Sequence, residues 1–223
     1  KTNLVFKNKF NLYLVVFLFL AIFLSVGSSV DIYLSSLFYF GNNQFLLQSY
    51  YYITIFVRKI ILPCIVIYVF ILPLFSFYLP INNLYLKYKF KFRDILFLWI
   101  IGIFNLGVVV NLFFKNIWGR ARPGDILQLG GKENFTPWFQ ISDACASNCS
   151  FVSGDAAVGF SLVVLYFLTK RIVYFWSSLF FGFGIGLIRI MEGGHFVSDV
   201  VMAAMILYLS YYFQMKYYFN NYD

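Results

Sequence analysis

The sequence predicts an all-α membrane protein whose helices cross the bilayer several times. Of its 223 residues, 61% are hydrophobic and 12% are charged, against roughly 25% charged residues in an average soluble domain. A soluble globule of this composition lacks the polar groups to cover its own surface, and a disordered chain needs low hydrophobicity and high charge. Three cysteines are too few for a disulfide scaffold. A polytopic membrane protein remains.

Six apolar stretches approach the length of about 20 residues that a helical span needs. In chain order they are 10–26, 60–79 (or from about residue 51), 95–114, 156–168, 173–188 and 200–213. The first has a basic start but no small-x-small cleavage site, so we expect a membrane span rather than a removed signal peptide. No repeat or linker divides the chain, and we therefore expect one domain of six transmembrane helices over residues 1–223.

The distribution of basic residues predicts how the chain is oriented. Ten of the 17 Lys and Arg residues lie on one side of the predicted spans, together with only two acids, Asp94 and Asp223. The ten are Lys1, Lys7, Lys9, Lys87, Lys89, Lys91, Arg93, Lys170, Arg171 and Lys216. The other side carries seven basic and seven acidic residues. The positive-inside rule then places both termini in the cytoplasm. The net charge of +8 thus serves orientation, and we expect no nucleic-acid partner.

Three polar segments stand at predicted span ends on the extracytoplasmic side. They are 115–123 after the third span, 150–155 before the fourth, and 189–199 between the fifth and sixth. A charge close to the bilayer is expensive, and each is therefore a candidate for function. The long polar stretch 115–155 also carries Trp and Pro residues, so we expect it to be folded against the membrane surface.

These segments combine the groups that bind phosphate. Four cations lie at one membrane level: Lys115, Arg120, Arg122 and Arg189. Arginine donates paired hydrogen bonds to phosphate oxygens. Ser153 and Gly154 precede a predicted helix, whose first backbone N–H groups attract an anion, and the glycine permits close approach. The sequence therefore predicts a phosphate cradle built from three helix ends.

His195 is the only histidine in the chain. Asp199 follows four residues later, on the same face of a helix, where its carboxylate can fix the imidazole tautomer. A neutral imidazole beside a bound phosphate is a competent nucleophile. One histidine without a Cys/His cluster does not make a typical zinc site, so we expect no metal and no cofactor.

Three motifs follow one another within residues 95–213: Lys115-x6-Arg122-Pro123, Ser153-Gly154 and Arg189-x5-His195-x3-Asp199. Together they resemble the signature of the type 2 phosphatidic acid phosphatase superfamily. The resemblance implies a six-helix membrane bundle and metal-independent hydrolysis through a phosphohistidine. It implies that His195 attacks phosphorus and that Asp199 orients it. The implied phosphate ligands are Lys115, Arg122, Arg189, Ser153 and Gly154, with Arg120 and Arg58 as accessory candidates.

Two residues depart from the family pattern. The second motif usually ends in a histidine that protonates the leaving group, whereas Asp155 stands there; the third usually has Ser where Ile188 precedes Arg189. A protonated Asp155 can act as the general acid, since low dielectric and an anionic substrate raise a carboxyl pKa. Alternatively it only positions Arg or Lys, and water protonates the leaving group. Both roles remain open at this point.

The second motif, Ser-Gly-Asp-Ala with Asn148-Cys149-Ser150-Phe151 upstream, is similar to the bacterial lipid A 4′-phosphatase branch. The resemblance implies a lipid phosphatase of the inner membrane whose site faces the periplasm, with the 4′-phosphate of lipid A as preferred substrate. Phosphatidylglycerophosphate, phosphatidic acid and undecaprenyl pyrophosphate are alternatives. A non-catalytic protein that binds anionic lipid is the alternative from another class.

Three further features have two interpretations each. Arg58 can contact an acidic headgroup or extend to the membrane interface, and we favour the second interpretation. Cys145 and Cys149 form a disulfide if the outer loop faces an oxidising compartment, and otherwise are free thiols. The glycines at 182, 184 and 186 favour close helix packing rather than a dinucleotide loop, because no strand precedes them.

Overall fold

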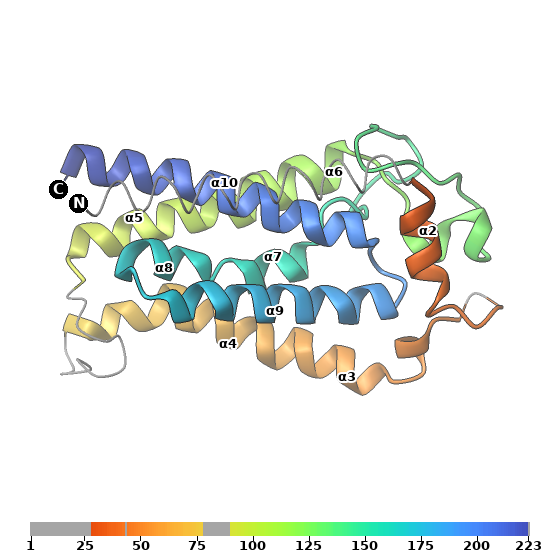
Figure 1. The fold of residues 1–223 in the computed structure, drawn as a ribbon, viewed down its shortest axis with the longest axis horizontal. Coiled ribbons are helices and arrows are strands. Elements are labelled where there is room, and N and C mark those ends of the chain that lie inside the picture. Colours follow the sequence, from red (N-terminus) through yellow and green to blue (C-terminus); the bar gives the residue numbers. More distant parts are fainter. Residues whose placement is uncertain (1–27, 43, 78–89, 223) are drawn as a thin grey trace.

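The computed structural model describes residues 28–42, 44–77 and 90–222, and within these ranges the chain is helical and contains no strand (Figure 1). The α-helices are α2 Ser28–Ser36, α3 Tyr51–Phe56, α4 Leu62–Val66, α5 Phe92–Gly102, α6 Lys115–Ile117, α7 Gly154–Phe160, α8 Val163–Thr169, α9 Ile172–Met191 and α10 Val197–Tyr222. The π-helical segments are Val57–Ile61, Ile67–Ile71 and Ile103–Phe114, and the 3₁₀ turns are Leu46–Gln48, Leu72–Phe77, Pro123–Asp125 and Leu127–Leu129. The predicted all-α class is confirmed.

Four helices of the described part of the chain are long and apolar enough to cross a membrane. They run over Tyr51–Phe75, Phe92–Ile117, Ile172–Met191 and Val197–Asn220. The helices Phe92–Ile117, Ile172–Met191 and Val197–Asn220 contain the predicted third, fifth and sixth spans. The helix Tyr51–Phe75 overlaps the predicted second span and begins at Tyr51, the earlier of its two predicted starts. The first predicted span, with Lys1, Lys7, Lys9, Lys87, Lys89 and Asp223, lies outside the described residues. The count of six spans stays a prediction.

The predicted fourth span is a short broken helix in the middle of the bundle (Figure 1). It covers Gly154–Thr169, with α7 and α8 meeting at a turn near Ser161. Its first half, α7, contacts α4, α9, α10 and the Ile103–Phe114 segment, so all four long helices touch it. A helix enclosed by protein does not need the length of a lipid-exposed span. The end of this helix that begins at Gly154 therefore stops inside the bundle, where it can support a site.

The crossing of α7 and α9 depends on a glycine in each helix. A Cβ added to Gly182 would lie 2.1 Å from Cδ1 of Phe160, and one added to Gly159 would lie 2.7 Å from the Gly182 nitrogen. Only glycine on both helices lets the backbones approach this closely. The packing role predicted for the glycines of α9 thus holds at Gly182, and also at Gly186, whose added Cβ would lie 2.4 Å from Cγ1 of Val200. It does not hold at Gly184, whose added Cβ would meet nothing within 4 Å.

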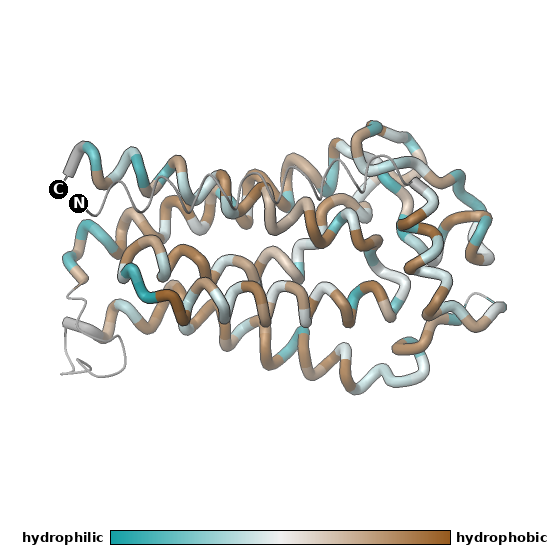
Figure 2. Tube along the Cα trace, in the orientation of Figure 1, coloured by the Kyte–Doolittle hydropathy of each residue, from teal (hydrophilic) through white to brown (hydrophobic). Residues whose placement is uncertain are grey.

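Apolar residues run along the long helices (Figure 2), and many of their side chains are exposed. Ile103 is 71% exposed and Phe180 is 75% exposed, and only 17% of the most hydropathic 18-residue window in Tyr51–Phe75 is buried. Soluble proteins rarely expose contiguous apolar surface of this extent. These faces are therefore suited to contact with lipid.

The end of the bundle that carries the loops is covered by α2 and by the stretch 118–153 (Figure 1). Phe45, Ile126, Leu129 and Phe196 form a small buried cluster there, and Trp118 stacks on Phe151 at 4.9 Å between ring centroids. The loop is folded, as its Trp and Pro content predicts. It connects the first polar segment to the second at this end of the bundle.

Candidate active site

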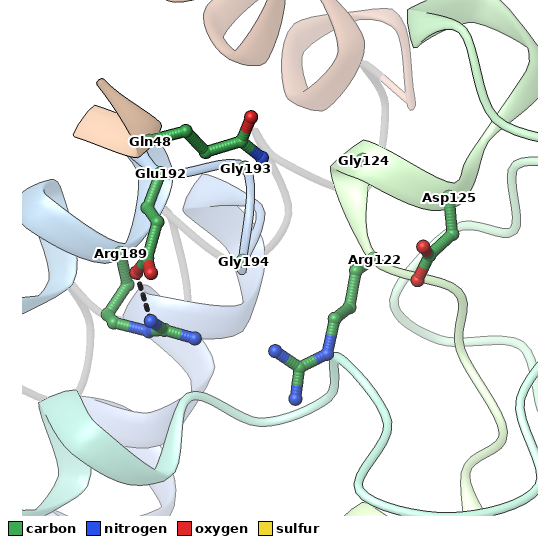
Figure 3. Close-up of a pocket in the computed structure, with 8 residues that line it drawn as sticks. All are labelled: Gln48, Arg122, Gly124, Asp125, Arg189, Glu192, Gly193 and Gly194. Atoms are coloured by element: carbon green, nitrogen blue, oxygen red, sulfur yellow. Dashed lines mark hydrogen bonds and ion pairs between the residues drawn. The ribbon is translucent and has the colours of Figure 1, made fainter. Parts of the chain in front are cut away.

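The three polar segments meet at the loop-bearing end of the bundle. Lys115 ends the helix Phe92–Ile117, Ser153 caps α7, and the third segment joins α9 to α10. An open pocket at the first and third segments is lined by Gln48, Arg122, Gly124, Asp125, Arg189, Glu192, Gly193 and Gly194. Figure 3 shows Arg189 and Glu192 on one side of this pocket and Arg122 and Asp125 on the other.

His195 is held in one orientation and one tautomer. Its side chain is 1% exposed, and Nδ1 lies 2.7 Å from the backbone carbonyl oxygen of Ser150. A carbonyl oxygen can only accept, so Nδ1 carries the proton and donates it, which leaves the lone pair on Nε2. Burial lowers the pKa of the imidazole to about 4, although the nearby Asp199 carboxylate opposes the shift. At neutral pH His195 is therefore an uncharged base.

Asp199 acts on His195 mainly through other residues. Its Oδ2 lies 3.8 Å from His195 Nδ1, which is too far for a hydrogen bond. The carboxylate instead accepts hydrogen bonds from the Ser150 hydroxyl at 2.5 Å and the Phe196 N–H at 2.8 Å. The direct partner that fixes the tautomer is thus the Ser150 carbonyl, where the sequence indicated Asp199.

Arg120 does not line the pocket. Its side chain is fully buried, and each guanidinium nitrogen donates to protein oxygens. The acceptors are the Thr136 carbonyl, the Ser198 hydroxyl and the carboxylates of Asp31 and Asp199. The expected accessory contact of Arg120 with phosphate is therefore replaced by a role inside the protein.

Of the three other predicted cations, Arg122 and Arg189 line the pocket, and all three have partners that a phosphate could replace. Lys115 Nζ donates to the Asn148 side-chain oxygen at 3.1 Å, and Arg122 donates to the Asn148 carbonyl at 2.7 Å. Arg189 pairs with Asp155 and Glu192. Burial, followed by repulsion from Arg189, lowers the pKa of Arg122. A cluster of mutually repelling cations favours the binding of an anion.

The second motif packs onto the other two. The Ser153 hydroxyl accepts the Ala156 N–H at 3.5 Å as the N-cap of α7, and the Ser153 N–H donates to the Asp199 carbonyl. A Cβ added to Gly154 would lie 3.0 Å from Cε of Lys115. The absence of a side chain at Gly154 thus lets the Lys115 side chain lie close to the start of α7.

Asp155 faces two guanidinium groups. Its Oδ2 lies 3.2 Å from Nε of Arg189 and 3.4 Å from Nε of Arg58. The side chain of Arg58 is 54% exposed, whereas that of Arg189 is 5% exposed. Arg58 is therefore exposed, as its predicted interfacial position implies, and it also contacts the site through its ion pair with Asp155.

The sulfur atoms of Cys145 and Cys149 are joined in a disulfide. The bridge closes a short loop in which Asn148 has a positive φ of 51°. The Cys149 N–H also donates to the Lys115 carbonyl. This loop therefore holds Asn148 against two of the predicted phosphate ligands.

Several residues around the site were missed by sequence reasoning. They are Gln48, Glu192, Asn148, Ser198 and Asp31. Glu192 and Asn148 lie within or next to the motifs and carry no distinct signal of their own. Asp31 does carry one, because it is the only charged residue between the first predicted span and Arg58, and a lone charge in apolar sequence indicates a buried partner.

The fold and site define a membrane-embedded helical protein with a neutral histidine beside a cationic pocket. The family model of the PAP2 superfamily matches residues 95–223, which is more than half of the chain. The protein belongs to the PAP2 superfamily. The matched range includes all three motifs.

Curated relatives carry one common name. The chain is 43% identical over 133 residues to "Lipid A 4′-phosphatase" of Francisella tularensis subsp. novicida, which covers 56% of this chain and 58% of the relative. It is 36% identical over 98 residues to the protein of that name from Rhizobium leguminosarum, covering 43% and 42%. The chain thus spans about half the length of these relatives. No solved structure matches it.

Proposed function

We propose that the protein is an integral membrane lipid phosphatase, which removes phosphate from a monoester through a phosphohistidine. The observation that carries the proposal is the state of His195. Its proton is committed to the Ser150 carbonyl, so the Nε2 lone pair is available at neutral pH. Arg189 and Lys115 are close enough to act on the imidazole electrostatically, and a neutral imidazole near such cations is suited to attack phosphorus.

The proposed reaction has two steps. Nε2 of His195 forms a bond to phosphorus while the bond between phosphorus and the lipid oxygen breaks in line. Lys115, Arg122 and Arg189 neutralise the phosphoryl oxygens, which carry most charge in the transition state. Water then attacks phosphorus, the N–P bond breaks, and inorganic phosphate leaves with His195 restored. Side-chain cations supply the positive charge, so the proposal includes no metal.

Asp155 is proposed to position Arg189 rather than to act as the general acid. Both of its charged partners are guanidinium groups, and the same oxygen, Oδ2, faces both of them. This geometry favours a carboxylate that holds Arg189 in place. Water then protonates the leaving oxygen. This assignment chooses between the two roles that the sequence left open.

The preferred substrate in this proposal is the 4′-phosphate of lipid A, since the relatives that are 35–43% identical bear the name of that activity. Phosphatidylglycerophosphate, phosphatidic acid and undecaprenyl pyrophosphate share the lipid phosphate that the pocket would bind. They are therefore the comparison substrates.

We further propose one domain in a bacterial inner membrane, with cytoplasmic termini and the pocket facing the periplasm. The start of α5, the α8–α9 junction and the end of α10 lie at the end of the bundle opposite the pocket (Figure 1). These helix ends carry Lys91, Arg93, Lys170, Arg171 and Lys216. The positive-inside rule supports a cytoplasmic location for this end.

The test is phosphate release by the purified protein from these four lipids in the presence of EDTA. We expect phosphate release to persist in EDTA, because the proposed mechanism uses no metal. Release should be fastest from lipid A, the preferred substrate of the proposal. His195→Ala should reduce kcat at least about 10⁴-fold, the scale of losing a catalytic nucleophile. A quenched reaction with labelled substrate should trap an acid-labile phosphoenzyme in the wild type and none in the variant.

Each outcome bears on a different part of the proposal. Activity retained by folded His195→Ala contradicts the phosphohistidine. Loss of activity in EDTA that added metal restores contradicts the metal-free mechanism. Absence of release from every lipid, with binding to anionic vesicles, favours the non-catalytic alternative.

A further inference from the structure

A buried charge network links α2 to the base of the candidate site. Arg120 donates to Asp199 at 2.5 Å and to Asp31 at 2.8 Å, and none of the three side chains is more than 3% exposed. Ser198 joins the same network, since its N–H and hydroxyl both donate to Asp31 at 3.0 and 2.5 Å. Asp31 thus binds residues that are 89 and 167 positions away in the chain.

The network is enclosed by aromatic rings. The guanidinium of Arg120 lies 4.3 Å from the ring centre of Phe196 and 5.4 Å from that of Phe135. A buried charge that loses one partner is strongly destabilised, because the remaining charge is left without water. Arg120 can therefore hold Asp199 in one position only while Asp31 satisfies its other side.

The network reaches His195 through Ser150. The Ser150 N–H donates to the Arg120 carbonyl at 2.9 Å, and its hydroxyl donates to Asp199 at 2.5 Å. Its carbonyl accepts the Nδ1 proton of His195. Arg120 and Asp199 together fix the backbone group that sets the orientation and tautomer of the histidine.

We infer that Asp31 is a positioning residue for the nucleophile, which acts through Arg120, Asp199 and Ser150. The inference rests on the proposed function, because it requires His195 to attack phosphate. Asp31 lies outside the segment that matches the family, residues 95–223, so this chain supplies part of its histidine support from an earlier helix. Asp31 does not line the pocket, and its partners are Arg120 and Ser198 rather than Lys115, Arg122 or Arg189.

The test compares Asp31→Asn with the wild type, using lipid phosphate hydrolysis and inhibition by inorganic phosphate. Loss of the charge should misalign His195 and reduce kcat by roughly 10- to 100-fold, as for other groups that orient a reacting residue. The inhibition constant of phosphate should change less than about twofold, because Lys115, Arg122 and Arg189 keep their contacts. Asp31→Glu should restore part of kcat.

The matched control is Asp94→Asn. Asp94 is also buried, caps α5 through the Lys91 N–H, and accepts from Tyr218 at the opposite end of the bundle. The same substitution there should lower thermal stability and leave kcat unchanged. Equal loss of kcat in the two variants would show a general effect of destabilisation and would overturn the inference.

A double substitution tests the route of the effect. In an Asp199→Asn background, Asp31→Asn should cost much less than in the wild type, because both act on one support. Full additivity would overturn the inference. If Asp31→Asn does not fold, Ser198→Ala, which removes one partner of Asp31, must show the same split between kcat and the phosphate constant. An inactive wild type would refute the proposed function itself, and an active wild type with unchanged kcat in Asp31→Asn would refute only this inference.

Discussion

The ion pairs of single residues at the site differ in how much they contribute to stability. The pair of Asp155 with Arg58 is half exposed, and exposed pairs are worth about 0–1 kcal/mol. The pair with Arg189 is largely buried and constrains a predicted phosphate ligand. Asp155 therefore matters mainly through Arg189.

Asp155→Asn removes the charge and keeps the size of the side chain. We expect KM to rise about tenfold, the equivalent of about 1.4 kcal/mol in binding, because Arg189 is no longer held. The pH dependence of kcat/KM should keep its shape. His195 is neutral above its lowered pKa, so protonation of the imidazole should reduce activity only as pH falls through about 4.

Steady-state kinetics between pH 4 and pH 9 check this expectation. A general acid must be protonated, and its removal would abolish the loss of activity at high pH. Disappearance of that alkaline limb in Asp155→Asn, with KM unchanged, would restore the acid role.

At the level of helices, α7 and α9 are positioned by backbone contact. Gly182 lies against Phe160, whereas Gly184, on the same helix, is exposed and meets nothing. The sequence shows three glycines at equal spacing and does not distinguish them. The rotation of α9 in the bundle makes Gly182 and Gly186 pack closely and leaves Gly184 outside the contact.

Gly182→Ala should lower the free energy of unfolding by about 1–3 kcal/mol, the usual cost of overpacking. The added methyl group would lie 2.1 Å from the Phe160 ring. Gly184→Ala should be neutral or slightly stabilising, because alanine favours a helix over glycine. Thermal unfolding in detergent measures both, and similar losses in the two variants would contradict the close crossing.

For the whole molecule, sidedness is the property that can be tested directly. An alkaline phosphatase reporter, which folds only outside the cytoplasm, should be active when fused after residue 140. It should be inactive when fused after residue 170, at the α8–α9 junction. The opposite pattern would mean that the basic helix ends face outward, against the positive-inside rule.

The sequence predicts the bundle well because hydropathy and charge are local signals. The sequence also singles out Lys115, Arg122, Arg189 and His195 as site candidates, since each lies in a motif at the end of a span. The support of His195 was not predictable, because it depends on contacts between residues that are 45 to 167 positions apart. The buried position of Arg120, two residues from Arg122, has the same cause.

The short loop closed by the disulfide has a consequence for turnover. Asn148 presents two uncharged oxygens to Lys115 and Arg122. Under the proposed function, an arriving phosphate exchanges these neutral contacts for charged ones, which are stronger. When the product departs, Asn148 takes its place and the cations are not left bare. Asn148 thus occupies the hydrogen-bond donors of Lys115 and Arg122 when phosphate is absent, which eases release of the product.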